Sequence, residues 1–198
     1  MFTYQIDIEY LGTKFVGWQF QKNGVSVQEV LEKALSKFLK DKIKVIGSGR
    51  TDAGVHAKGQ SAHFKTKRKI DYNDNFINSM NFFLRNHPVS ILNIKKRPKM
   101  FHARHSAKNR IYKYSIINRY SPLIIEKGKA WHIKKRLDIK IMQKGIKILR
   151  GTHNFNTFRS ASCQAKSPIK TIKKILIFIS AIGCLLYTSP SPRDQRGS

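Results

Sequence analysis

Acidic residues are scarce in this chain. It has 11 Asp and Glu against 39 Lys and Arg, which gives a formal net charge of +28 over 198 residues. So few carboxylates disfavour a site that requires two acids close together in the sequence. The cationic excess predicts a polyanionic partner, of which nucleic acid is the most common. A base-composition bias that enriches Lys, Ile and Asn is the alternative explanation for part of this excess.

Cysteine and long apolar runs are also scarce. Cys163 and Cys184 form neither a disulfide framework nor a CxxC motif, which fits a reducing cytoplasm. The first residues lack the basic and apolar regions of a signal peptide. The longest apolar run, 175–187, is interrupted by Ser180 and is too short to span a membrane. We therefore expect a cytoplasmic protein, and apolar residues at 40% are enough to build a core.

Hydrophobic periodicity predicts alternating strands and helices. Residues 4–10 alternate apolar and polar side chains, as a half-buried strand does. A helix begins after Ser26, with Glu29 completing a capping box and an apolar stripe continuing to Leu39. The further elements expected are strands at 43–46, 60–65, 89–94, 110–117 and 171–179 and helices at 73–85 and 137–149. This order predicts an α+β fold with two similar halves that share a sheet.

The segment Ser48–Ala57, SGRTDAGVHA, contains the strongest candidate for chemistry. Its glycines allow the backbone to approach a ligand closely, and it holds Asp52 two residues after Arg50. The other acids lie at strand faces, on the first helix, at helix starts, in a lysine-rich loop or in the C-terminal tail. Asp52 alone lacks such a routine position. The alternative is an Asx-turn in which Asp52 binds amides of its own loop.

Other candidates are weaker. Arg50 could pair with Asp52 or hold a phosphate. Tyr112 and Tyr114 lie on one face of a strand among basic residues, where they could stack on an unpaired base or simply pack. No histidine lies at a spacing from Cys163 that would indicate a thiol nucleophile. His102 and His105 have no further ligands, so we expect no metal site.

Seven motifs match a known family in its own order. They are YxGTxFxGWQxQ at 10–21, SVQEVLEKAL at 26–35, SGRTDAGVHAKGQ at 48–60, FHARxSA at 101–107, RxYxY at 110–114, GxHNFxxF at 151–158 and SPIKTI at 167–172. Because of these seven motifs, the chain resembles the tRNA pseudouridine synthase A (TruA) family across about residues 3–180.

The resemblance implies a cofactor-free and metal-free isomerase that converts uridine to pseudouridine at positions 38–40 of the anticodon arm of tRNA. Asp52 would be the catalytic residue, whether it attacks the ribose C1′, attacks the uracil ring or acts through a glycal intermediate. Arg50 would help to extrude the nucleotide or orient Asp52, and Tyr112 would stack on the base. The implied fold has two α+β halves with a mixed, mainly antiparallel sheet, helices on one side and a basic cleft. The implied assembly is a homodimer.

One departure concerns the C-terminal end. The family continues after SPIKTI with a segment resembling FLxxMVRxxxG, whereas this chain continues as CLLYTSPSPRDQRGS. We therefore expect an N-terminal half at 1–103, an incomplete C-terminal half at 104–182 and a non-native or disordered tail at 183–198. An unpaired sheet edge would follow. The alternatives are a catalytically impaired tRNA-binding protein and a chain that does not fold stably.

Overall fold

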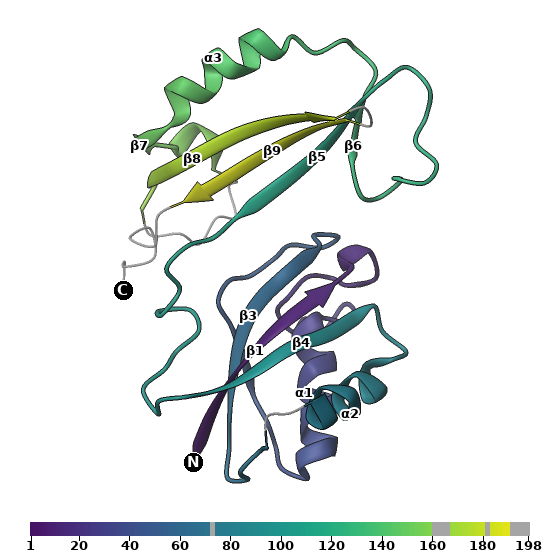
Figure 1. Cartoon of the computed structure of the whole chain (residues 1–198), viewed down its shortest axis with the longest axis vertical. Coiled ribbons are helices and arrows are strands. Elements are labelled where there is room, and N and C mark those ends of the chain that lie inside the picture. Colours follow the sequence, from purple (N-terminus) through teal and green to yellow (C-terminus); the bar gives the residue numbers. More distant parts are fainter. Residues whose placement is uncertain (72–73, 160–166, 181–182, 191–198) are drawn as a thin grey trace. The chain divides into compact units, whose positions relative to one another are not determined.

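The chain forms two compact units, Met1–Ser106 and Ala107–Ser198 (Figure 1). The computed structural model describes residues 1–198 except 72–73, 160–166, 181–182 and 191–198. Each unit contains a sheet whose strand pairs are all or mostly antiparallel and at least one helix, so the α+β class is confirmed. The boundary between the two units falls after Ser106, whereas the sequence predicts it after residue 103.

Unit 1 is a four-stranded antiparallel sheet with two helices on one face (Figure 1). The strand order is β2-β3-β1-β4, with β1 in the interior of the sheet. Its elements are β1 (Phe2–Tyr10), the 3-10 turn η1 (Gly12–Lys14), α1 (Val27–Leu39), β2 (Val45–Gly47), β3 (Ala57–Thr66), α2 (Asp74–Leu84) and β4 (Val89–Arg97). The elements expected in this region are all present, with ends that shift by a few residues.

The alternation of β1 places one row of side chains in the core. Tyr4, Ile6 and Ile8 are fully buried, and the intervening residues lie on the opposite face of the sheet. Leu31 and Leu35 of α1 and Met80 of α2 are equally buried and form one cluster with the β1 side chains. Burial of this apolar surface is the main stabilising term of unit 1.

Helix α1 begins where its capping residue predicts. Ser26 has an extended backbone, and its Oγ accepts a hydrogen bond from the Glu29 amide at 3.2 Å. The second half of the capping box is replaced by an ion pair, because the Glu29 carboxylate binds Lys33 Nζ at 2.6 Å. The helix ends at Leu39, and the capping residue Lys40 adopts the left-handed conformation with φ 50°.

Unit 2 contains a five-stranded sheet in the order β6-β5-β9-β8-β7. The β5–β6 pair is parallel, and the other neighbouring pairs are antiparallel. The elements are β5 (Tyr112–Asn118), β6 (Trp131–Ile133), α3 (Ile139–Leu149), β7 (Gly151–Asn154), the 3-10 turn η2 (Asn156–Phe158), β8 (Ile169–Ser180) and β9 (Gly183–Pro190). Asp138 caps α3 as expected, accepting a hydrogen bond from the Ile141 amide at 3.1 Å.

The described strands form a four-stranded sheet in unit 1 and a five-stranded sheet in unit 2, and the expectation that the two halves share one sheet stays a prediction. The expectation about the C-terminal tail needs a correction. Residues 183–190 also belong to the fold, because β9 pairs with β5 on one side and β8 on the other. The pairing of Ser180 with Gly183 starts this ladder, and the Leu-Leu-Tyr-Thr sequence that follows suits a strand. The unpaired edge expected next to β8 is therefore filled, and residues 191–198 lie outside the described part.

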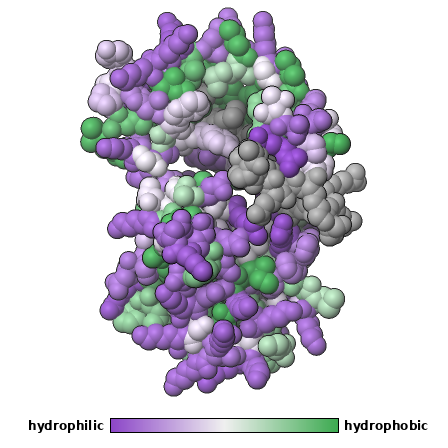
Figure 2. Space-filling view, turned by 180° about the vertical axis from the view of Figure 1, so that it is seen from behind, coloured by the Kyte–Doolittle hydropathy of each residue, from purple (hydrophilic) through white to green (hydrophobic). Residues whose placement is uncertain are grey.

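The surface is rich in hydrophilic side chains. Figure 2 shows one face on which they predominate over smaller apolar patches. No helix within the described residues combines the length and apolar character that crossing a bilayer requires.

Candidate active-site loop

The SGRTDAGVHA segment links two neighbouring strands of unit 1. Strands β2 and β3 form an antiparallel pair in which Gly47 lies opposite Ala62. The Ser48 amide continues this pairing with a hydrogen bond to the Ser61 carbonyl at 2.7 Å. Gln60 Nε2 then donates to the Gly49 carbonyl at 2.7 Å. The start of the loop is thus bound to β3.

A second segment of backbone, just after β1, packs directly against the loop. A Cβ placed on Gly12 would lie 2.1 Å from the Val55 carbonyl oxygen and 2.7 Å from the Gly54 carbonyl carbon. Only glycine permits so close a backbone approach. The Gly12 amide also donates to His56 Nδ1 at 2.9 Å. The YxGT motif therefore positions the loop.

Gly17 and Trp18 hold the other side of the loop. Gly17 has φ +117°, and a Cβ on it would lie 2.7 Å from the Thr51 carbonyl oxygen. The Trp18 amide donates to that same Thr51 carbonyl at 2.9 Å. The Trp18 ring is buried and packs against Gly47 closely enough to exclude any side chain there.

Tyr10 connects the loop to the core. Its hydroxyl shares a hydrogen bond of 2.8 Å with Thr51 Oγ1, and its ring contacts Phe15 and Trp18 with centroids 6.4 and 6.2 Å apart. Burial raises the pKa of the Tyr10 hydroxyl above its ordinary value, while the hydrogen bond with Thr51 opposes the shift. Thr51, directly before Asp52, is therefore fixed through its side chain and its carbonyl.

Asp52 is exposed on this fixed backbone. Its carbonyl accepts a hydrogen bond from the Val55 amide at 3.2 Å, which closes a turn over Ala53 and Gly54. In the part of the chain that the structure describes, no hydrogen bond or ion pair engages its carboxylate. The Asx-turn alternative requires such a bond to a loop amide. The arrangement instead presents a carboxylate to solvent from a rigid support.

Several other acids have structural partners, as their positions suggested. Asp7 accepts from Gln5 Nε2 at 3.2 Å, and Glu32 accepts from the Val45 amide at 2.9 Å. Glu29 is paired with Lys33 and Asp138 caps α3. Among the described residues the carboxylates of Glu9 and Asp41 have no such partner either, so the role of Asp52 stays a prediction.

The other two predicted site residues lie in different units. Arg50 is exposed in the same loop as Asp52. Tyr112 is the first residue of β5 in unit 2, and it is 43% exposed. Tyr114, two residues on, is 57% exposed, so neither tyrosine is a core residue. Exposed aromatic rings of this kind are available for stacking.

A cluster of three histidines lies on the face of β3 opposite the core, with tilted rings. His63 is buried, and its ring centroid lies 4.8 Å from that of His102, which lies 4.4 Å from that of His105. His63 Nδ1 accepts from the Ala103 amide at 3.1 Å. Burial first, then His102 and Lys65, lower the pKa of His63 to about 4. Among the described residues, no group of His, Cys, Asp or Glu is arranged to hold a metal ion. The ring contacts and the hydrogen bond from Ala103 hold the FHARH segment, residues 101–105, against β3.

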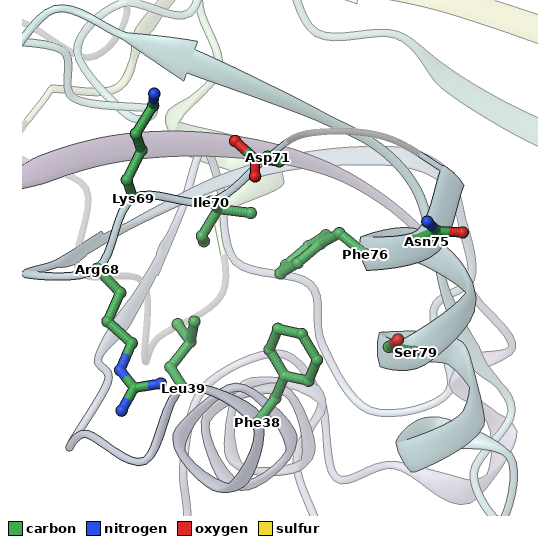
Figure 3. A pocket seen from close by; sticks show the side chains of 9 residues that line it. All are labelled: Phe38, Leu39, Arg68, Lys69, Ile70, Asp71, Asn75, Phe76 and Ser79. Carbon is green, nitrogen blue, oxygen red and sulfur yellow. The ribbon is translucent and has the colours of Figure 1, made fainter.

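One hollow of unit 1 is a separate feature. It has a volume of about 290 Å³ and lies between the end of α1, residues 68–71 and the start of α2 (Figure 3). The rings of Phe38 and Phe76 point toward one another there, with centroids 5.4 Å apart. Because none of its lining residues belongs to the loop, we do not assign it to the candidate site.

Comparisons with known proteins support the family resemblance that the loop motif indicates. Residues 7–106 match the tRNA pseudouridine synthase family. The chain is 58% identical over 177 residues to tRNA pseudouridine synthase A of Pelagibacter ubique, an alignment that covers 89% of this chain and 72% of that protein. This chain belongs to the tRNA pseudouridine synthase family. It is also 46% identical to the enzyme of the same name from Parvibaculum lavamentivorans, over 88% of this chain and 70% of that protein.

Membership of the synthase family directs attention to residues that the sequence pattern alone did not select. Gly12, Gly17 and Tyr10 support the Asp52 loop, although all three lie far before it in the chain. The signal was present in the YxGTxFxGWQxQ motif, whose two glycines among aromatic residues indicate a close backbone approach. The partner of that approach is visible only in the fold.

Proposed function

We propose that this chain isomerises uridine to pseudouridine in tRNA, at positions 38–40 of the anticodon arm, with Asp52 as the catalytic carboxylate. The observation that carries the assignment of Asp52 is its exposed carboxylate on a loop clamped by Gly12, Gly17 and Trp18. A catalytic group that its surroundings already hold in place needs little reorganisation to reach the geometry of the reaction. Family membership supports the reaction itself.

The reaction is redox-neutral and needs no co-reactant. The bond between uracil N1 and ribose C1′ breaks, the base rotates, and a bond between C5 and C1′ forms. C5 then loses its proton and N1 gains one, so substrate and product have the same atoms. Asp52 would assist by attack on C1′ or on the ring, or by removing a ribose proton to form a glycal. The target base must first leave the helical stack.

Arg50 and Tyr112 are proposed to bind the substrate. An arginine two residues from the carboxylate offers donors in a planar fork that matches a phosphate. Tyr112 has an exposed ring that can stack on the extruded base. The charge of +28 supports tRNA as the partner, with an affinity that falls as salt rises.

Assembly and the C-terminal residues complete the proposal. A homodimer and two structurally similar halves are proposed from the family resemblance. That residues 183–198 are unrelated to the family stays a prediction. The alignment with the Pelagibacter relative covers 89% of this chain, so a part of the chain lies outside the matched region.

The test is tritium release from tRNA labelled at uridine C5, with the Asp52→Ala variant beside the unaltered chain. We expect release from the unaltered chain and a loss of at least about 10³-fold in the variant, with tRNA binding nearly unchanged. Equal release from both proteins would reject the role of Asp52. Binding without release by the unaltered chain would instead favour the catalytically impaired tRNA-binding protein.

A further inference from the structure

One arginine outside the loop is held in a defined position on unit 1. Arg97 is the last residue of β4, and its Nε donates to Gln5 Oε1 at 2.7 Å. Its guanidinium carbon lies 5.3 Å from the centroid of the Phe101 ring. Gln5 alternates with Tyr4 and Ile6, which are buried in the core. Arg97 and Gln5 therefore occupy the sheet face opposite α1 and α2.

Hydrogen bonds that meet at Ser61, one at its side chain and one at its carbonyl, connect Arg97 to the Asp52 loop. Gln5 Nε2 donates to Ser61 Oγ at 2.8 Å and to Asp7 Oδ1 at 3.2 Å. The Ser61 carbonyl in turn accepts from the amide of Ser48, the residue that starts the loop, at 2.7 Å. These hydrogen bonds cross β4, β1 and β3, and they relate the position of Arg97 to the backbone that carries Asp52.

The guanidinium retains donors for a ligand. Arginine carries five N–H donors in a rigid fork, and Gln5 uses the one at Nε. Within the described residues, its two Nη groups have no hydrogen bond or ion pair. Such a pair of donors matches two oxygens of one phosphate. Because Gln5 and Phe101 already restrict the side chain, less conformational entropy is lost on binding.

We propose that Arg97 binds a backbone phosphate of the RNA substrate, with Gln5 and Phe101 as its positioning residues. The proposal rests on the proposed function only for the identity of the RNA. The net charge of +28 favours a polyanion over an acidic small molecule. The network also holds one carboxylate in place, because Gln5 Nε2 donates a hydrogen bond to Asp7 Oδ1.

Arg85 provides a matched control. It is an exposed arginine that follows α2, and its guanidinium carbon lies 4.2 Å from the Phe82 ring centroid. It therefore has the same charge and the same kind of aromatic contact as Arg97, but it belongs to the helical layer of unit 1. Comparing the two alanine variants separates a phosphate contact from a general loss of positive charge.

The experiment measures the affinity of each variant for an unmodified tRNA transcript over a series of salt concentrations. We expect Arg97→Ala to bind about five- to tenfold more weakly near 0.1 M salt, with the slope of log K against log salt reduced by about one. Arg85→Ala should change affinity by less than about twofold. Equal effects of the two variants would overturn the proposal.

Two more variants test positioning. Gln5→Ala keeps every charge, so we expect an affinity loss of about threefold with the salt slope unchanged. Arg97→Lys should restore the slope but not the full affinity, because a lysine makes no bidentate contact. An unchanged affinity in Gln5→Ala would show that Gln5 does not position Arg97. Chemical denaturation of each variant identifies any loss that comes from unfolding.

Tritium release separates this proposal from the proposed function. Arg97→Ala should raise KM and leave kcat nearly unchanged, since a remote phosphate contact contributes equally to substrate and transition state. Wild-type chain that binds RNA through Arg97 but releases no tritium would reject the isomerase and keep the phosphate site. If the chain is active but its KM does not depend on Arg97, the isomerase is kept and the phosphate site is rejected.

Discussion

The two units have similar ingredients but bury them very differently. In unit 1 the helices cover one sheet face, and a cluster from Tyr4 to Ile94 contains 23 buried apolar residues. In the described part of unit 2 the buried apolar residues are Ile116, Ile117, Leu123 and Ile175. Helix α3 has a strongly amphipathic sequence and yet no buried residue. The catalytic candidate is thus attached to the unit with the dense core, and the exposed tyrosines belong to the other.

This difference shows what each unit can contribute to chemistry. A carboxylate needs a fixed position, and the fixed position of Asp52 comes from backbone contacts that the core of unit 1 supports. Stacking on a base needs an accessible ring, which Tyr112 provides without a dense core around it. The predictions below test whether the contrast in packing is also a contrast in stability.

Core truncation should give the largest difference. Leu35→Ala in α1 removes a fully buried side chain and should lower the free energy of unfolding by about 2–5 kcal/mol. Ile148→Ala in α3 removes a side chain that is 73% exposed, so we expect a change within about 0.5 kcal/mol. Unfolding of unit 1 can be followed by the fluorescence of Trp18, which is buried, and unfolding of unit 2 by circular dichroism, because Trp131 is already exposed. Equal losses would show that the two helices are packed alike in solution.

Acid should destabilise unit 1 through His63. Its pKa is lowered from 6.5 to about 4 in the folded chain, so the unfolded state takes up a proton first as the pH falls. Above about pH 6.5 His63 leaves the free energy of unfolding unchanged. As the pH falls toward 4, the free energy of unfolding decreases progressively, by up to about 3 kcal/mol. Burial, His105, Arg104 and Lys65 lower the pKa of His102 as well, which adds to the same trend.

The measurement is Trp18-detected unfolding at pH 7 and at about pH 4.5. His63→Gln cannot titrate at this position and should show a weaker pH dependence than the unaltered chain. His153→Gln, which replaces an exposed histidine of unit 2, should retain the full dependence. The same pH dependence in all three proteins would contradict the role of His63.

Gly17→Ala should damage the loop selectively. It places a Cβ 2.7 Å from the Thr51 carbonyl and forces alanine to φ +117°, so we expect a loss of about 2 kcal/mol in stability. Displacement of Thr51 would also move Asp52, and kcat for tritium release should fall by about tenfold or more. Gly59→Ala is the control, because its Cβ would meet no atom within 4 Å. A normal kcat in Gly17→Ala would show that the loop tolerates this displacement.

Cap removal should give the smallest effects. Ser26→Ala and Asp138→Ala each delete one hydrogen bond to a helix N-terminus, worth about 1 kcal/mol. We expect the full loss for Ser26, whose helix is part of the core. A smaller loss is expected for Asp138, because α3 can fray without exposing buried residues. Circular dichroism and denaturant unfolding distinguish fraying from global destabilisation.

Local signals were enough to predict most elements of unit 1. The cap at Ser26, the stripe to Leu39 and the alternation in β1 each act within a few residues. The sheets were harder to predict, because pairing depends on partners far along the chain. The three-residue β6 lies parallel to β5 and has too little sequence to show a period. Strand β9 was missed because the Ser/Pro-rich end of the chain obscured a short segment of good strand formers.

The site shows the same division. The scarcity of acids selected Asp52 and the motif selected Arg50 and Tyr112, whose roles stay predictions. The clamp on the loop was not predictable, because it joins Gly12 to Val55 and Gly17 to Thr51 by backbone alone. No side-chain pattern records a contact of that kind.

The close approach of Gly12 to Val55 also affects how mutational data for this chain should be read. A survey that scores activity alone would find Gly12 as intolerant as Asp52, although it has no reactive group. Scoring the amount of folded protein in parallel would separate them, since an Asp52 variant should accumulate normally and a Gly12 variant should not. Residues that shape the catalytic loop would then be distinguished from the residue that performs the reaction.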